Sequence, residues 1–407
     1  MSAPHALDVP SLIAEFDEHA NWAQVDLKRA KDEGRLVVGL YCGYIPFELI
    51  RAAGGIPVSL CGDDQEAIAA AEATLPRNLC PLIKSSYGLA VTDTCPFFHF
   101  SDILIGETTC DGKKKTFELL GLLKPTHVMQ LPYDRNAPGA GASWLAELRR
   151  VAAFMAEHGG VAVTDDALSS EIRVENEIRR KLQRVLAGFR GDVPPLTWQQ
   201  MLYVRRLHDF LVDRSVYLEL LDRLTTVLDG ETAVTSETAV TSETLATANP
   251  VAMAGPAAVS PRRPRLLITG TPMSPDTNKV MRLAEEAGAR VVAHDACSGS
   301  KTFDRLADEA GDPWESLARF TLDLPCACMS PNENRLDLLR RTVRDFRVEG
   351  VIDVVWQACH TFNVESAVLG GTVRDELGLH YLKIETDYST ADEGQLRTRI
   401  EAFVESL

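Results

Sequence analysis

Cysteine is the residue type in this sequence that points most directly to chemistry. The 407-residue chain contains nine cysteines. One C-x-C pair occurs, at Cys326 and Cys328, and there is neither a C-x-x-C pair nor zinc-finger spacing. The first residues lack a basic start and an apolar stretch, so we expect no secretion signal and predict reduced thiols. Reduced thiols serve as metal ligands, redox groups or core side chains.

Residues 78–115 bring two of these cysteines toward one place. Cys80 precedes Pro81, and proline is favoured in the first turn of a helix. Cys110 follows the apolar run 103–105, which is predicted to be a buried strand. Helix N-termini favour thiolates, and ligands of α/β sheets collect where strands end. The sequence therefore predicts two thiols near one crevice, with buried core cysteines as the alternative.

Alternating strands and helices predict two α/β domains, in a chain that is too long for one core. We place the first domain at residues 1–160 and the second at residues 265–407. The fold class is therefore α/β, with two parallel-sheet domains of the flavodoxin/Rossmann type. The expected strands are 36–41, 57–60, 103–105 and 127–131 in the first domain, and 266–269, 291–294, 351–356 and 382–385 in the second.

Three other segments complete the predicted architecture. An amphipathic helix capped by Ser11 is expected to begin the first domain. Residues 161–228 have a helical pattern interrupted at Pro194 and Pro195, which predicts two long helices packed against the first domain. Residues 229–264 repeat ETAVTS and continue into an Ala/Pro-rich run, which is typical of a flexible linker.

Cysteines follow predicted strands or short apolar runs in both halves, so the interdomain cleft is where they can converge. A helix beginning at Pro81 would carry Cys95 about 16 Å away, to the opposite edge of the sheet, which predicts a structural role for Cys95. So many thiols fit iron–sulfur ligation better than zinc, which needs only four ligands. The competing candidates are Cys42, Cys61, Cys80 and Cys110 in the first domain, and Cys297, Cys326, Cys328 and Cys359 in the second.

Polar residues near these cysteines have possible supporting roles. Lys84 and Ser85 could donate hydrogen bonds to cluster sulfides, which would raise the reduction potential, or could be solvated residues of a helix start. His360 is a candidate proton donor, or alternatively a hydrogen-bonding partner of a metal ligand. Glu107 and Glu365 are further candidate proton donors.

Composition limits the partners. The formal net charge of −16 argues against nucleic acid, whose phosphates require a basic surface. No apolar run is long enough to span a bilayer. The segment GETTCDGKK resembles a P-loop, but Asp111 replaces the second glycine and no Ser or Thr follows the lysines. We therefore expect a cytoplasmic protein without a nucleotide site of its own.

Several sequence segments, spread over both halves of the chain, match a known family in order. They are YCGYIPFELIRAAGGIPVSLC, LPRNLCPLIKSSYG, GETTCDGKKK, CACMSPNENR, QACHTFNVES and IETDYST. By these segments the chain resembles subunits of the 2-hydroxyacyl-CoA dehydratase and benzoyl-CoA reductase family, and within it is most similar to the double-cubane-cluster reductases of anaerobes.

The resemblance implies a cofactor and its ligands. Dehydratase-type relatives hold one 4Fe–4S cluster with three cysteines, whose positions we carry onto Cys80, Cys110 and Cys359. Double-cubane relatives hold an 8Fe–9S cluster with six cysteines. Thr271 stands where some relatives have a cysteine. If that cysteine is a cluster ligand, its absence here argues against the double cluster. With Cys42 preferred over Cys61, and Cys326 over Cys328, the six predicted ligands are Cys42, Cys80, Cys110, Cys297, Cys326 and Cys359.

The same resemblance implies a function. We expect an iron–sulfur reductase component that reduces a small substrate with low-potential electrons from an ATP-hydrolysing iron–sulfur activator protein, and a homodimer. One alternative is a 2-hydroxyacyl-CoA dehydratase subunit with a single 4Fe–4S cluster. Another is a cluster-carrying protein without catalytic activity.

Overall fold

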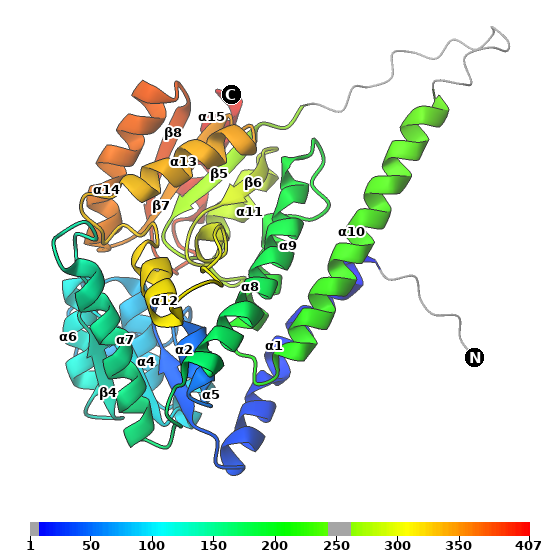
Figure 1. Ribbon diagram of the computed structural model, residues 1–407. Helices are drawn as coiled ribbons and strands as arrows, with labels where there is room; N and C mark the ends of the chain where they lie inside the picture. Colours follow the sequence, from blue (N-terminus) through cyan, green and yellow to red (C-terminus); the bar gives the residue numbers. More distant parts are fainter. Residues whose placement is uncertain (1–7, 243–261) are drawn as a thin grey trace, which may run out of the picture.

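Two four-stranded parallel sheets form the framework of the protein, which confirms the predicted fold class (Figure 1). The computed structural model describes residues 8–242 and 262–407. The first sheet has the order β2-β1-β3-β4 and the second the order β6-β5-β7-β8. Their strands are β1 (Val37–Leu40), β2 (Ile56–Ser59), β3 (Ile103–Glu107), β4 (Thr126–Met129), β5 (Arg265–Gly270), β6 (Arg290–His294), β7 (Gly350–Trp356) and β8 (His380–Thr386).

The central strands are apolar along most of their length because helices cover both faces of each sheet. Every residue of β1, β3, β5 and β7 is buried. Continuous burial is typical of parallel sheets. The helices around the sheets are α2 (Phe47–Ala52), α3 (Ile68–Ala71), α4 (Pro81–Val91), α5 (Pro96–Phe100), α6 (Asp111–Leu120) and α7 (Ala140–Glu157) in the first domain, and α11 (Lys279–Glu286), α13 (Glu333–Asp345), α14 (His360–Gly371) and α15 (Glu393–Glu405) in the second. The helix α12 (Pro313–Leu322) comes from the second half of the chain but packs on α7 of the first domain.

Both sheets reverse their strand order at the same place. The chain crosses from one side of the sheet to the other between β1 and β3, and again between β5 and β7. Ligands of open α/β sheets bind outside the carboxyl ends of strands at such points. The loops after these four strands are therefore the ones placed to form a site.

A third layer consists of long helices, as Figure 1 shows. The helix α1 (Val9–Asp32) packs on α9 (Trp198–His208) and α10 (Arg214–Ser242), and α8 (Asp165–Ala187) packs on α10 and on α2. The prediction of two helices after residue 160 therefore differs from the structure, which has three. A side-chain cap at Thr197, with Gln200 completing a capping box, starts α9 as a separate helix.

Two predicted segments differ from the structure. The helix α1 begins after Asp8, whose carboxylate accepts a hydrogen bond from the Ser11 N–H at 2.8 Å, so Ser11 is not the cap. The backbone of α10 is helical to Ser242, so helix occupies the first part of the segment predicted to be a linker. Residues 243–261 of that prediction lie outside the described residues.

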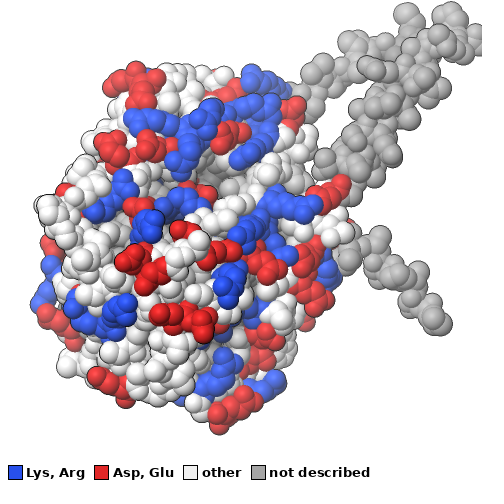
Figure 2. All heavy atoms as spheres, in the orientation of Figure 1, with Lys and Arg blue, Asp and Glu red and all other residues white. Residues whose placement is uncertain are grey.

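The surface carries charges of both signs. On the face in Figure 2, basic and acidic side chains are interspersed. In the described part of the chain, no helix is long and apolar enough to cross a membrane.

Candidate metal centre

One cavity of about 1010 Å³ is lined by loops and helix ends of both α/β domains and of the helical layer. All nine cysteines of the chain line it. The predicted convergence of strand-end cysteines on one crevice is thus a feature of the structure. The lining cysteines are Cys42, Cys61, Cys80, Cys95, Cys110, Cys297, Cys326, Cys328 and Cys359.

Three of these cysteines, besides Cys95, each precede a helix. Cys80, Cys110 and Cys359 are the N-cap residues of α4, α6 and α14. The Cys110 sulfur accepts a hydrogen bond from the Lys113 N–H at 3.4 Å. Contact with the Cys359 thiol, with help from the N–H groups of Leu82 and Ile83, lowers the pKa of Cys80 although burial opposes this. Burial raises the pKa of Cys110, and the hydrogen bond with Cys80 together with burial raises that of Cys359. Helix N–H groups act on all three sulfurs, but they outweigh burial, with the Cys359 contact, only at Cys80.

A second group gathers Cys42, Cys297 and Cys326. Cys42 follows β1, Cys297 follows β6, and the charge on Cys42 interacts with both other sulfurs. Cys326 follows α12, so no strand end presents it. A hydrogen bond from the Cys328 thiol and the charge of Lys301 hold the pKa of Cys326 well below its usual value, against the effect of burial.

The two less favoured thiols are already engaged with protein oxygens. The Cys61 thiol donates to the Tyr41 carbonyl at 3.2 Å, and the Cys328 sulfur lies 3.5 Å from the Tyr44 hydroxyl. These contacts support the preference for Cys42 and Cys326 as ligands, which stays a prediction.

Cys95 differs from its predicted location. It caps α5 and lines the same cavity as the other cysteines. The chain reverses direction after α4, where Asp93 has a positive φ of 53° and the Thr94 N–H bonds to the Leu89 carbonyl. This turn brings Cys95 back to the cavity. Burial raises the pKa of its thiol, as it does for Cys42 and Cys110, so the predicted structural role of Cys95 stays a prediction.

Lys84 and Ser85 are not among the residues that line the cavity, so the structure does not support the predicted contacts with a cluster. The Lys84 ammonium lies 2.8 Å from a carboxylate oxygen of Glu72. The Ser85 hydroxyl donates to the Asp64 carbonyl at 2.8 Å and accepts from the Asp64 N–H at 3.0 Å. Both residues face α3 and the loop after β2, whereas Leu82 and Ile83 line the cavity.

The candidate acid–base residues differ in environment. His360 is exposed and lines the cavity beside Cys359. Glu365 is held 2.7 Å from Nε of the buried Arg335. Glu107 is fully buried, and burial raises its pKa. One of its two carboxylate oxygens, Oε2, has no hydrogen-bond partner in the described structure.

Two lysines extend into this region. The Lys113 ammonium pairs with Glu107 and donates to the Tyr41 carbonyl at 2.7 Å. The Lys301 ammonium lies 3.7 Å from the Cys297 sulfur. Burial alone would lower the pKa of Lys301, but the charges of Cys297 and Cys326 outweigh burial and raise it. The sequence does not reveal Lys301, because this residue lies in the long connection between β6 and α12, where no motif marks it.

The donor set fits an iron–sulfur cluster. Within residues 8–242 and 262–407, no three His, Cys, Asp or Glu side chains lie close enough to share a single metal ion. Cysteines of a cubane bind different irons and stand farther apart than the ligands of one ion. Sulfur donors in two sets around one cavity match cluster ligation.

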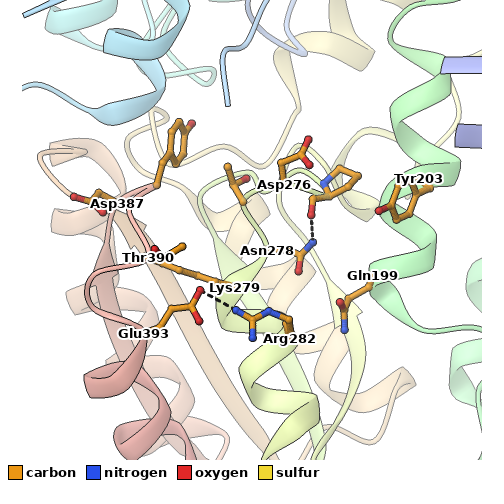
Figure 3. A pocket seen from close by; sticks show the side chains of 12 residues that line it. Gln199, Tyr203, Asp276, Asn278, Lys279, Arg282, Asp387, Thr390 and Glu393 are labelled. Atoms are coloured by element: carbon orange, nitrogen blue, oxygen red, sulfur yellow. Dashed lines mark hydrogen bonds and ion pairs between the residues drawn. The ribbon is translucent and has the colours of Figure 1, made fainter. Parts of the chain in front are cut away.

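A second pocket, of about 190 Å³, lies between α9 and the loops that start α11 and α15 (Figure 3). Its cations are paired with acids. The Lys279 ammonium pairs with Asp392, and Arg282 donates to Glu393 at 2.8 Å. We assign no separate site to this pocket.

Comparison with known proteins identifies the family. Residues 42–407 match the family described as 2-hydroxyglutaryl-CoA dehydratase, D-component. The chain belongs to this dehydratase family. The family predicted from the sequence segments is thereby confirmed.

The dehydratase family includes relatives of different activity. The chain is 40% identical over 400 residues to YjiM of Escherichia coli (strain K12), and the match covers 98% of this chain and 99% of YjiM. YjiM is provisionally named as a dehydratase subunit. It is 20% identical to the (R)-phenyllactyl-CoA dehydratase beta subunit of Clostridium sporogenes, over 94% of both chains. It is 26% identical to a benzoyl-CoA reductase subunit of Thauera aromatica, over 40% of this chain and 42% of that one.

Proposed function

We propose that this protein is an iron–sulfur reductase component that holds a double-cubane 8Fe–9S cluster and reduces a small molecule. The observation that carries the proposal is the placement of six candidate thiols, from both domains, on one cavity. Electrons of low potential come from an ATP-hydrolysing activator protein with its own cluster. The chain itself contains no complete nucleotide-binding motif, which is consistent with a separate activator.

The proposed ligands divide into two sets. Cys80, Cys110 and Cys359 would hold one cubane, and Cys42, Cys297 and Cys326 would hold the other. When bound, the cluster supplies electron storage and transfer at low potential. Residues of both domains line the cavity that would surround it. The helix N-termini at the first set, and Lys113 and Lys301 near the second, offset part of the negative charge of the thiolates.

His360 is the proposed proton donor to the substrate. It lines the cavity directly beside Cys359, and the ordinary pKa of histidine lies near neutrality. Glu107 is placed less well because its carboxylate is paired with Lys113. The pairing of Glu365 with Arg335 likewise leaves it a supporting role.

The proposed setting is a cytoplasmic homodimer that works without a membrane or a nucleic acid. Two of the relatives described above are named as subunits of a dehydratase and of a reductase, which supports an assembled state.

A dehydratase subunit with one 4Fe–4S cluster is the second candidate function. It is favoured by the names of the relatives and by the close approach of Cys80 and Cys359, with Cys110 near both. A cluster carrier without turnover is the remaining alternative.

Iron content separates these candidates. After strictly anaerobic purification we expect about eight irons per chain, because thiols of both domains bind the cluster. The measurement is iron and acid-labile sulfide per polypeptide, with EPR spectroscopy of the reduced form. About four irons would favour the dehydratase. Zinc in place of iron would contradict both enzymes.

A further inference from the structure

Lys301 is a buried lysine whose charge faces sulfur. It lies in a short 3-10 segment (Ser300–Thr302), and its side chain is 1% exposed. Its ammonium nitrogen is 3.7 Å from the Cys297 sulfur and 5.4 Å from the centre of the Phe362 ring. Among residues 8–229 and 262–407, whose side chains are described, no carboxylate oxygen lies within 4.0 Å of this nitrogen.

Other buried lysines of the chain are neutralised by carboxylates. Lys113 pairs with Glu107, Lys84 with Glu72, and Lys279 with Asp392. Burying a charge without a partner is costly, so a buried ammonium is found where negative charge compensates it. At Lys301 the contacting group is instead a sulfur of the second cysteine set, that of Cys297 at 3.7 Å.

We propose that Lys301 is a positioning residue that raises the reduction potential of the cluster half held by Cys42, Cys297 and Cys326. This inference rests on the proposed function, since it requires a cluster at those cysteines. Reduction adds one electron, delivered by the activator, and makes the cluster more negative by one charge while no bond breaks. A fixed cation in a water-poor site stabilises the reduced form more than the oxidised form.

The consequence is an unequal pair of cluster halves. The other buried lysine near the cysteines is Lys113, whose charge acts on Cys110 of the first set and on Cys42 of the second, and Glu107 already balances that charge. Lys301 has no such carboxylate among the described side chains, so it acts on the second half alone. The incoming electron is therefore held first on the half beside Lys301.

The test compares the midpoint potential of Lys301→Met with that of the unmodified protein, by EPR-monitored redox titration of anaerobically purified, iron-replete samples. We expect at least a tenfold smaller equilibrium constant for adding the first electron, which is about 59 mV toward more negative potential. Lys301→Arg keeps the charge and is expected to stay near the unmodified value. Lys114→Met is the matched control, because Lys114 is exposed and pairs with Asp111 on the surface of α6.

Three results would decide against the inference. An iron-replete Lys301→Met protein with an unchanged potential would overturn it, and so would an equal shift in Lys114→Met. If Lys301→Met does not retain iron, the Lys301→Arg protein is measured in its place. A potential near the unmodified value then supports the role of charge, and a tenfold smaller equilibrium constant for adding the first electron refutes it. Absence of iron from the unmodified protein would instead refute the proposed function.

Discussion

At the scale of single residues, the sulfur atoms have distinct environments within one cavity. Cys80, Cys95, Cys110 and Cys359 each precede a helix, yet contact with Cys359 lowers the pKa of Cys80 whereas burial raises the pKa of Cys95 and Cys110. Cys61 and Cys328 lie within hydrogen-bonding distance of protein oxygens. These differences mean that a shared cavity does not make the nine cysteines equivalent.

Single substitutions test this distinction. Cys80→Ala, Cys110→Ala and Cys359→Ala are each expected to lose half or more of the bound iron, because each removes a proposed ligand. Cys95→Ala is the matched control and is expected to keep its iron. Iron per polypeptide is the measurement, with circular dichroism to verify folding. Full iron content in a folded Cys110→Ala protein would contradict the assignment.

At the scale of elements, a buried ion pair joins two helices of the third layer beside the cavity. Glu175 on α8 and His208 on α9 lie 3.0 Å apart, and Arg214 on α10 also contacts Glu175. Burial opposes the charge on both partners. The charge of His208 and the nearby arginines nevertheless lower the pKa of Glu175 to about 2, and Glu175 with Asp209 raises the pKa of His208.

This pair predicts a pH dependence of stability. Because the pKa of His208 is higher in the folded protein, its contribution is complete below about pH 6.5 and is lost as the pH rises through the folded value. The contribution of Glu175 is present above about pH 4.5 and is lost as the pH falls toward about 2. We expect His208→Gln to cost on the order of 1 kcal/mol more in the free energy of unfolding at pH 6 than at pH 9. Urea unfolding at both values measures this, and an equal cost at both would contradict it.

At the scale of the whole molecule, the site exists only where the two domains meet. The Tyr388 hydroxyl donates to the Gly62 carbonyl at 3.0 Å, and the Tyr44 hydroxyl donates to the Leu324 carbonyl at 3.2 Å, so each domain bonds to a cavity-side segment of the other. A cluster bound by thiolates from both sides carries much negative charge. Adding an electron to it is therefore unfavourable unless the donor is strong.

The unfavourable addition of an electron limits which donors can reduce the proposed cluster. We expect reduction of small acceptors only when the cognate activator, MgATP and a strong reductant are present together. A ferredoxin alone is expected to give less than about one hundredth of that rate, roughly 2.7 kcal/mol in barrier. The measurement is anaerobic turnover with each component omitted in turn. Rapid turnover without activator or ATP would show that the activator proposal is wrong.

The sequence alone determined the α/β class and the position of thiols at strand ends in both halves. Buried strands leave apolar runs that need no tertiary knowledge, and parallel strands place their carboxyl ends at one edge of their sheet. Residues just past the ends of one sheet, such as Cys42 and Cys110, therefore lie near each other, whereas their meeting with Cys359 of the second sheet depends on how the two domains dock.

Tertiary structure decided which way the other side chains face. Lys84 and Ser85 sit one turn from Cys80, yet helix rotation aims them at α3, and a turn after α4 returns Cys95 to the cavity. Lys301 reaches Cys297 from an irregular segment that has no periodicity to reveal it. Such contacts depend on helix rotation and on the docking of distant segments. Both are set by the packing of the whole chain, and local sequence does not encode them.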